Sequence, residues 1–241
     1  MAIIVDTVYQ RVLALANKEQ RGYITPQEFN LLANHAQQDI FEQYFYDLNQ
    51  FDRSKSNDLE YSDMMKLLQE KIAVFEQYKV ASSNVSSNVV TLPTDVYRLG
   101  TVYYNNSSYN VEVEEVGKKE LEYMLRTQLA APTAARPVYI RKNATVLNLF
   151  PASPSVGYNT ANVRCNYIKK PEKVVWTYNV VAGNALYNAT ASDHQNFELH
   201  ESEETELVYK ILELAGISLN KPGLVQLAGT EDMQKQQQEK Q

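Results

Sequence analysis

Two histidines and two acidic residues gathered late in the chain are the first candidates for chemistry. His194 and His200 flank Asp193 and Glu198, a set that in principle can bind a metal ion or exchange protons. Their spacing matches no zinc motif such as H-E-x-x-H, and the segment has the composition of a loop. His35 lies beside the apolar stripe of a predicted helix, where a hydrogen-bonded helix histidine is the ordinary interpretation. The sequence therefore predicts no metal site at these residues.

Carboxylates elsewhere also fall short of catalytic patterns. Glu112, Glu114 and Glu115 alternate with valines, which is typical of the solvated face of a strand rather than of paired glycosidase acids. Residues 52–58 alternate acids and serines like a calcium loop, but Asn57 stands where an EF-hand has glycine. No P-loop, nucleophile-elbow or dinucleotide motif is present. We therefore expect no enzyme, no metal and no cofactor.

Basic residues are concentrated in the middle of the chain. Between positions 118 and 173 they include Lys118, Lys119, Arg126, Arg136, Arg141, Lys142, Lys169, Lys170 and Lys173. With Tyr123, Tyr139 and Tyr167 nearby, they resemble a weak nucleic-acid face. We favour a surface that meets acidic neighbours, with residues 198–206 of an adjacent copy as the complement.

The composition of the 241 residues is that of a soluble globular protein. A net charge of −6 argues against broad nucleic-acid binding and suits a protein past which DNA slides. Seventeen tyrosines against one tryptophan are consistent with either interfaces or β-strands. A single cysteine excludes an internal disulfide framework. We expect no signal peptide and no membrane-spanning segment.

The pattern of elements is helical, then strand-rich, then helical. Residues 6–79 have helical periodicity, and Thr25-Pro26 with Glu28 forms a capping box at the start of a long helix. Short strands separated by turns are predicted over residues 89–178, and residues 179–200 look irregular. Ser202 is a candidate N-cap for an amphipathic helix that closes at Gly216.

These elements predict an α+β fold. We expect a helical bundle built from both chain ends, residues 1–80 and 198–216, because a single C-terminal helix must bury its apolar stripe. An antiparallel β-rich lobe, residues 81–197, is inserted between them. Residues 217–241 form an extended C-terminal arm with no core of its own, which folds against a partner. Its apolar anchors, and our candidate interface with a portal or a neighbouring subunit, are Leu219, Leu224, Val225 and Leu227.

Five segments resemble blocks of a virion structural protein of podovirus-like tailed bacteriophages, including crAss-like phages. They are RGYITPQEFN (21–30), QYFYDLN (43–49), LPTDVYRL (92–99), RPVYI (136–140) and the terminal segment 198–226. The resemblance implies a head–tail connector protein, also called an adaptor or neck protein. Such proteins are similar in plan, with a helical bundle, a β-lobe and a C-terminal arm that docks onto the portal or a neighbouring ring.

The resemblance also implies partners and a location. The expected assembly is a homo-oligomeric ring, typically a dodecamer, which contacts the portal protein and the next tail or ring protein. Double-stranded DNA passes without sequence-specific binding, and no membrane is involved. The protein would be made in the bacterial host cytoplasm and act in the virion at the head–tail junction. The alternative is a carbohydrate- or receptor-binding virion protein that uses the Tyr-rich β-lobe as its binding module.

Overall fold

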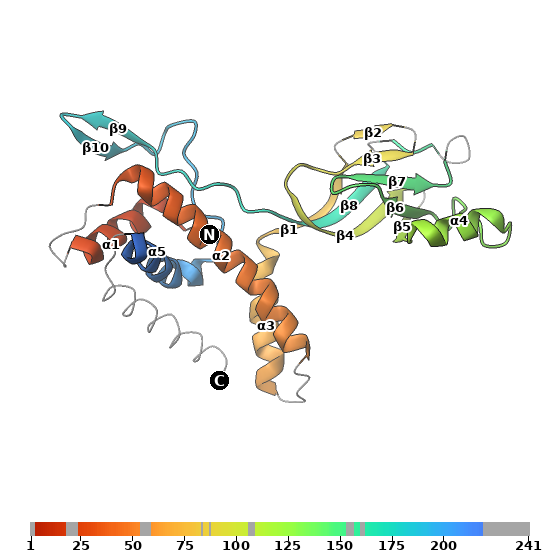
Figure 1. Ribbon diagram of the computed structural model, residues 1–241, viewed down its shortest axis with the longest axis horizontal. Coiled ribbons are helices and arrows are strands. Elements are labelled where there is room, and N and C mark those ends of the chain that lie inside the picture. The colour runs from red at the N-terminus through yellow and green to blue at the C-terminus, as the bar shows by residue number, and fades with distance from the viewer. Residues whose placement is uncertain are drawn as a thin grey trace. The chain divides into compact units, whose positions relative to one another are not determined.

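The chain folds into two compact units (Figure 1). The computed structural model describes residues 3–17, 24–53, 59–82, 84–86, 88–105, 109–152, 157–159 and 162–218. One unit, here called the terminal unit, comprises residues 1–74 and 171–241. The other, here called the β unit, comprises residues 75–170. The chain therefore leaves the terminal unit once, builds the β unit and returns.

The terminal unit contains helices from both ends of the chain. They are α1 (Val5–Asn17), α2 (Pro26–Arg53), α3 (Leu59–Ala73), the 3-10 turn η1 (Glu201–Glu203) and α5 (Glu204–Ser218). Helix α5 packs against α1 and α2, and α3 packs against α2. Apolar side chains at helical spacing are fully buried between α1, α2 and α5, among them Val8, Phe29, Ile40, Leu207 and Ile211. Burial of these stripes drives the association of the helices.

The predicted capping box at the start of α2 is confirmed. The Thr25 backbone N–H donates to Glu28 Oε2 at 2.9 Å, and the Glu28 backbone N–H donates to Thr25 Oγ1 at 3.3 Å. These reciprocal bonds use backbone donors that the first helical turn leaves without partners. The hydrogen bonds from Thr25 also lower the pKa of the Glu28 carboxyl.

Side-chain amides of α2 hold the segment that returns from the β unit. Asn34 accepts from the Val174 backbone N–H through Oδ1 and donates to the Val174 carbonyl through Nδ2, both at 2.8 Å. Asn30 makes the same pair of bonds to the backbone of Trp176, at 2.8 and 3.3 Å. Buried Gln37 donates to the Glu172 carbonyl at 2.8 Å. The side chains of Asn30, Asn34 and Gln37 are here called the amide ladder. They form hydrogen bonds with backbone groups of an extended segment, as a neighbouring strand would, and these groups would otherwise be buried without partners.

A β-hairpin belongs to the same unit. Strands β9 (Tyr178–Val181) and β10 (Asn184–Tyr187) pair in an antiparallel fashion. They are joined by Ala182 and Gly183, whose φ angles of 49° and 82° lie in the left-handed region. Two consecutive left-handed residues are the geometry of the tight turns that match the twist of a hairpin. Trp176 stacks on both Tyr178 and Tyr187, with ring centroids 5.6 and 5.8 Å away.

The β unit is a curled sheet with one helix. Within the described residues its strands are β1 (Glu76–Ala81), β2 (Asn84–Ser86), β3 (Val89–Thr91), β4 (Val96–Asn105), β5 (Asn110–Glu115), β6 (Val138–Arg141), β7 (Val146–Phe150) and β8 (Val163–Lys169). They are ordered β1-β8-β4-β5-β6-β7-β3-β2. Strands β5 and β6 run parallel, and the other neighbouring pairs are antiparallel. Helix α4 (Lys118–Arg126) lies in the connection between β5 and β6.

The core of the β unit lies inside the curl of the sheet. It contains Val90, Leu92, Val102, Tyr104, Val113, Tyr139, Leu147, Leu149, Tyr158, Val163, Cys165 and Tyr167. A smaller cluster joins Val116, Leu121 and Val138 beneath α4. Four tyrosines, Tyr104, Tyr139, Tyr158 and Tyr167, are therefore part of the buried core of this unit.

The predicted fold class, a helical bundle from both chain ends with an inserted antiparallel lobe, is wrong. The molecule is strand-rich, and its large sheet is mixed rather than antiparallel. Helices alone do not complete the core of the terminal unit. Val174, Trp176, Phe197 and Leu199 from the returning segment are buried there as well. The sequence interpretation assigned this segment to the lobe of residues 81–197, because its extended, Asn-rich composition carries no helical period.

Three local expectations are also wrong. Helical structure was predicted as far as residue 79, but α3 ends at Ala73 and strand β1 begins at Glu76. The segment expected to be irregular, 179–200, contains most of the β9–β10 hairpin. Helix α5 continues through Gly216 to Ser218, and the turn before it is capped by His200, which accepts from the Ser202 backbone N–H. Packing on neighbouring elements decides these boundaries, and local propensity does not.

Replacing Asn34 with alanine tests the amide ladder. We expect a loss of about 2 kcal/mol in the free energy of unfolding of the terminal unit, since the buried backbone of Val174 loses both partners. The single tryptophan, Trp176, is buried in this unit, so its fluorescence during urea unfolding reports on this unit.

The matched control is Gln38→Ala on the same helix. The Gln38 amide donates to Glu42 at the surface, and its loss should cost less than about 0.5 kcal/mol. Amide hydrogen exchange at Val174 should accelerate only in the Asn34 variant. Unchanged protection of Val174 in that variant would show that the ladder does not hold the returning segment.

Candidate functional site

The predicted interface residues follow the last described helix. Leu219, Leu224, Val225 and Leu227 lie outside the described residues, which end at Ser218 in α5. Their assignment as anchors of a C-terminal arm therefore stays a prediction.

The three histidines make separate local contacts. His35 Nε2 lies 3.5 Å from Asp39 Oδ2, one helical turn away at the surface of α2. His194 Nε2 lies 2.7 Å from the Tyr187 hydroxyl and so ties the base of the hairpin to the loop that follows it. His200 caps η1. In the part of the chain that the structure describes, no group of three or more His, Cys, Asp or Glu side chains is arranged to hold a metal ion.

The acidic segment 198–206 is engaged within its own chain. Glu203 is only 1% exposed and accepts from Lys71 Nζ at 2.9 Å. Glu204 pairs with Arg11 at 3.0 Å, and Glu198 accepts from the Glu172 backbone N–H at 2.9 Å. The expected use of this segment as a complementary surface for a neighbouring copy is therefore not what the geometry favours.

The acidic residues lie on an exposed strand, as their spacing predicted. Glu112, Glu114 and Glu115 are exposed along β5. Glu115 accepts a hydrogen bond of 2.9 Å from the Tyr139 hydroxyl. Burial of Tyr139 and this bond to a carboxylate both raise the pKa of the phenol. The phenol therefore stays protonated and serves as a fixed donor across the strands.

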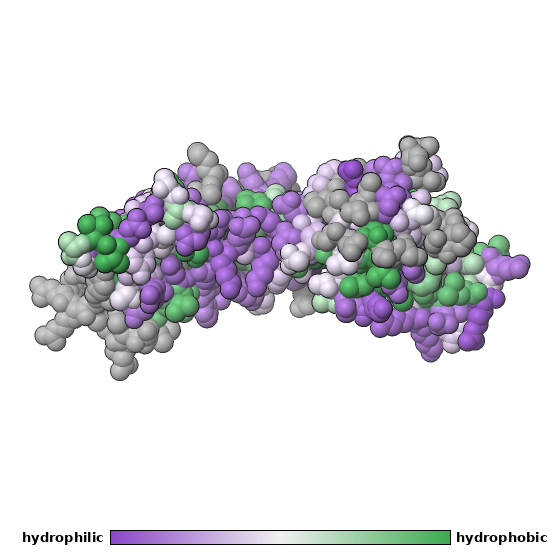
Figure 2. Space-filling model, turned by 90° about the horizontal axis from the view of Figure 1, so that it is seen from above, coloured by the Kyte–Doolittle hydropathy of each residue, from purple (hydrophilic) through white to green (hydrophobic). Residues whose placement is uncertain are grey.

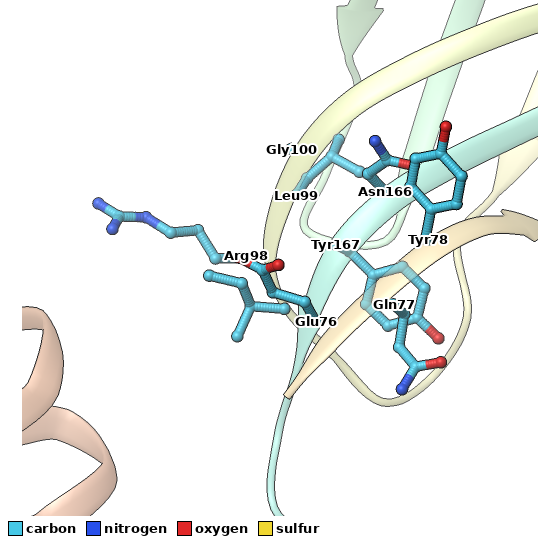
Figure 3. Close-up of a pocket in the computed structure, with 9 residues that line it drawn as sticks. Glu76, Gln77, Tyr78, Arg98, Leu99, Gly100, Asn166 and Tyr167 are labelled. Atoms are coloured by element: carbon cyan, nitrogen blue, oxygen red, sulfur yellow. The ribbon is translucent and has the colours of Figure 1, made fainter. Parts of the chain in front are cut away.

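A pocket of about 280 Å³ opens in the β unit (Figure 3). Three adjacent strands line it, with Glu76, Gln77 and Tyr78 from β1, Arg98, Leu99 and Gly100 from β4, and Asn166, Tyr167 and Ile168 from β8. The pairing register shifts between Gln77 and Val80 in β1, and between Leu99 and Val102 in β4. Such bulges re-aim side chains and interrupt the ladder, which creates the space between the strands.

Gly100 keeps the floor of this pocket open. A Cβ atom at this position would lie 3.1 Å from the Asn166 carbonyl oxygen, closer than ordinary packing allows. Beside it, the Tyr167 hydroxyl donates to both carboxylate oxygens of Asp95 at 3.1 Å. Burial, followed by this bond to Asp95, raises the pKa of Tyr167 to about 12. The Tyr167 phenol therefore stays protonated, and its bond to Asp95 fixes the ring in the wall of the pocket.

The pocket offers groups that bind polar ligands. Figure 3 shows the Tyr78 ring and the Asn166 side chain close together, with Arg98 extended in another direction. Tyr78 is 72% exposed, so an aromatic face is accessible beside the Asn166 amide. An aromatic face with planar hydrogen-bonding groups suits recognition of a sugar-like or other polar molecule. The sequence interpretation missed this site, because a bulge leaves no signal in hydrophobic periodicity.

Neither a scan against protein-family models nor a search of curated proteins found a match for this chain. No described helix is both long and apolar enough to span a membrane.

The pKa of Cys165 yields a testable property of the β unit. Burial, together with the charge of Asp95, raises the pKa of this thiol from 9.0 to about 11. At pH 8 we expect a thiol reagent to label the native chain at least about 100-fold more slowly than the urea-unfolded chain, because the thiolate is scarce and enclosed. An added exposed thiol, Asn143→Cys, should label rapidly.

The same shift sets a pH dependence of stability. The folded state favours the neutral thiol, so its contribution is present below pH 9 and is lost as the pH rises through about 11. Cys165→Ala should reduce the loss of β-unit stability across that interval. Equal labelling rates for folded and unfolded Cys165 would contradict its burial.

Proposed function

We propose that this chain is a structural, non-catalytic virion protein that forms a ring in the head–tail connector of a podovirus-like tailed phage. The ring joins the portal to the tail and lines the DNA channel. One observation carries the proposal: the two compact units of the chain have opposite net charge. The resemblance of five sequence blocks to connector proteins supplies the location in the virion.

The charge difference follows from the sequence and the division into units. The β unit has eleven Lys and Arg residues against seven Asp and Glu residues, a net charge of +4. The terminal unit has the remaining twelve basic and twenty-two acidic residues, a net charge of −10. Contacts between unlike units of neighbouring copies are therefore attractive, and contacts between like units are repulsive.

Such a charge pattern suits a head-to-tail assembly. A two-fold dimer uses one surface twice, whereas a ring joins two different surfaces of each subunit. Because the two units of one chain carry opposite charge, each copy presents a different surface to each of its two neighbours. A two-fold dimer that pairs like units is disfavoured. A net charge of −6 also keeps the assembly from binding the phosphate backbone of DNA broadly.

Attachment to the portal is assigned to the chain that follows α5. Leu219, Leu224, Val225 and Leu227 are its apolar positions. A segment of this length that folds onto a partner buries about 1,000 Å² or more. Repetition around a ring turns weak individual attachments into strong overall binding.

A second candidate function rests on the pocket of the β unit. Tyr78 and Tyr97 are 72% and 46% exposed, while Tyr104, Tyr139 and Tyr158 are buried. An exposed aromatic ring at a pocket with a few polar side chains is a feature of glycan-binding proteins, so a carbohydrate- or receptor-binding virion protein is the alternative. Because many of the lobe's tyrosines are core residues, the connector is the function that we propose.

Deleting residues 219–241 tests attachment through the C-terminal arm. We expect particles that carry this deletion to lose the portal–tail junction and their packaged DNA, since the deletion begins after Ser218, the last residue of α5. Cryo-EM of the native particle should show the chain as a ring beneath the portal. Density only at the tail periphery would overturn the proposal.

Two matched sets of substitutions test whether the apolar side chains, and not only the length of the segment, attach it to the portal. Serine at Leu219, Leu224, Val225 and Leu227 should reproduce the effect of the deletion. Serine at Gln236, Gln237 and Gln238 should leave assembly intact, because these positions remove no apolar surface. Equal effects of the two sets would show that the apolar positions are not the anchors.

A glycan screen tests the alternative. The connector proposal expects no retention of the purified full chain on immobilised glycans. If the chain does bind, a loss of at least about tenfold in affinity in Tyr78→Ala would assign binding to the pocket. Tyr109→Ala removes an equally accessible ring, 59% exposed, and is the control. Binding that Tyr78→Ala abolishes and Tyr109→Ala spares would favour the second function.

A further inference from the structure

The β9–β10 hairpin exposes a group of apolar side chains. Val180, Val181 and Leu186 are 68%, 54% and 53% exposed. The ten residues from 178 to 187 contain no charged side chain. Figure 2 shows the resulting hydrophobic surface in green over this hairpin. The strand register places Val181 and Leu186 on one face of the hairpin and Val180 on the other. Uncharged, exposed apolar surface of this kind marks interaction sites on proteins.

The hairpin is held at its base and open at its tip. Among the described strands, β9 and β10 pair only with each other. A two-stranded hairpin of this kind is marginally stable in water on its own. Here the base is fixed by the Trp176 rings stacked on Tyr178 and Tyr187, and by the bond from Trp176 Nε1 to Asp6 at 2.9 Å. The tip is therefore presented in a defined direction without being covered.

Exposed apolar side chains also lie at the C-terminal end of α4 in the β unit. Leu125 on α4 is 48% exposed and Leu129 in the turn after the helix is 95% exposed, whereas Tyr123, 58% exposed, lies on the opposite side of the helix from Leu125. A leucine with almost its whole surface in water is costly to leave exposed in a partner-free protein. Basic side chains of α4, Lys118, Lys119 and Arg126, are exposed as well, together with Glu120 and Glu122.

We propose that the hairpin of one copy docks at Leu125 and Leu129, at the C-terminal end of α4, in a second copy of this chain. Val181 and Leu186, which share one face of the hairpin, supply the apolar contact. Asp6 and Asp193, at the base of the hairpin, face the basic residues of α4. The inference rests on the proposed ring and names the subunit contact within it.

The charges of the two units favour a second copy as the occupant. The hairpin belongs to the unit with charge −10 and α4 to the unit with charge +4, so this pairing is the attractive one. A stable pairwise interface buries about 800 Å² on each partner, more than a ten-residue hairpin offers. Each contact is therefore weak, and a closed set of such contacts gives the stability that one contact lacks.

Cysteine cross-linking of the full chain tests the contact. We would make Val181→Cys and Leu129→Cys as two single variants and as one double variant. Under oxidation, a mixture of the two single variants should give disulfide-linked dimers and no larger species. The double variant should give a ladder of higher species, because each copy then presents both halves of the contact. The native Cys165 is buried and does not compete.

The control replaces Leu129→Cys with Tyr109→Cys, which is 59% exposed on the same unit but lies outside α4. Equal cross-linking to Tyr109→Cys, dominant Val181–Val181 dimers, or no cross-link at high chain concentration would each overturn the contact. Electron microscopy of the wild-type chain separates the two proposals. Rings without the cross-link contradict the contact alone, whereas the cross-link in open chains contradicts the ring alone.

A matched pair of charge substitutions gives an independent readout. Val181→Asp should weaken self-association in sedimentation experiments at least about tenfold, because it buries a charge in the apolar contact. Thr205→Asp adds the same charge at an exposed position of α5 in the same unit, outside the hairpin, and should change association less than about twofold. Equal effects of the two substitutions would show that net charge, not docking of the apolar tip, governs association.

Discussion

The hydrogen bonds from α2 to the returning chain are the constraint on which the terminal unit depends. The chain leaves this unit before residue 75 and comes back at residue 171, so the return must be fixed by contacts distant in sequence. Asn30, Asn34 and Gln37 meet that need with bonds to the backbone of residues 172–176. They let a helix accept an extended segment as a neighbour. Without them, buried Val174 and Trp176 would bring unpaired backbone groups into the core.

Buried charged side chains are paired within their own unit, and the net charge of each unit lies on its surface. Glu203 is buried with Lys71 as its partner, an arrangement in which the loss of either residue leaves an uncompensated charge. These internal pairs hold η1 and α5 in place but do not neutralise the unit, which retains −10. The hairpin is uncharged within this acidic unit. Association can thus be steered by charge while the contact itself is apolar.

The sequence predicted elements whose signals are local and missed those set by distant contacts. The capping box at Thr25 and Glu28 was predicted, and so were short strands within residues 89–178, such as β4, because caps and alternating patterns involve near neighbours. The helix predicted over β1 and the missed hairpin have the opposite cause. Strand β8 pairs with β1 from far along the chain, and Trp176 at the base of the hairpin is held by Asn30 and Asp6, which are distant in sequence. The pocket depends on two bulges and Gly100, and neither feature has a periodic signature.

An assembly contact carried by a hairpin requires that the hairpin be oriented before the partner arrives, because ordering it on contact would cost affinity. Trp176 provides this orientation. Its backbone is held by Asn30, its indole N–H donates to Asp6, and its ring supports Tyr178 and Tyr187. The interactions that close the terminal unit therefore also aim the hairpin. In a ring, the stability of each subunit and the strength of its contacts would rest on the same few side chains.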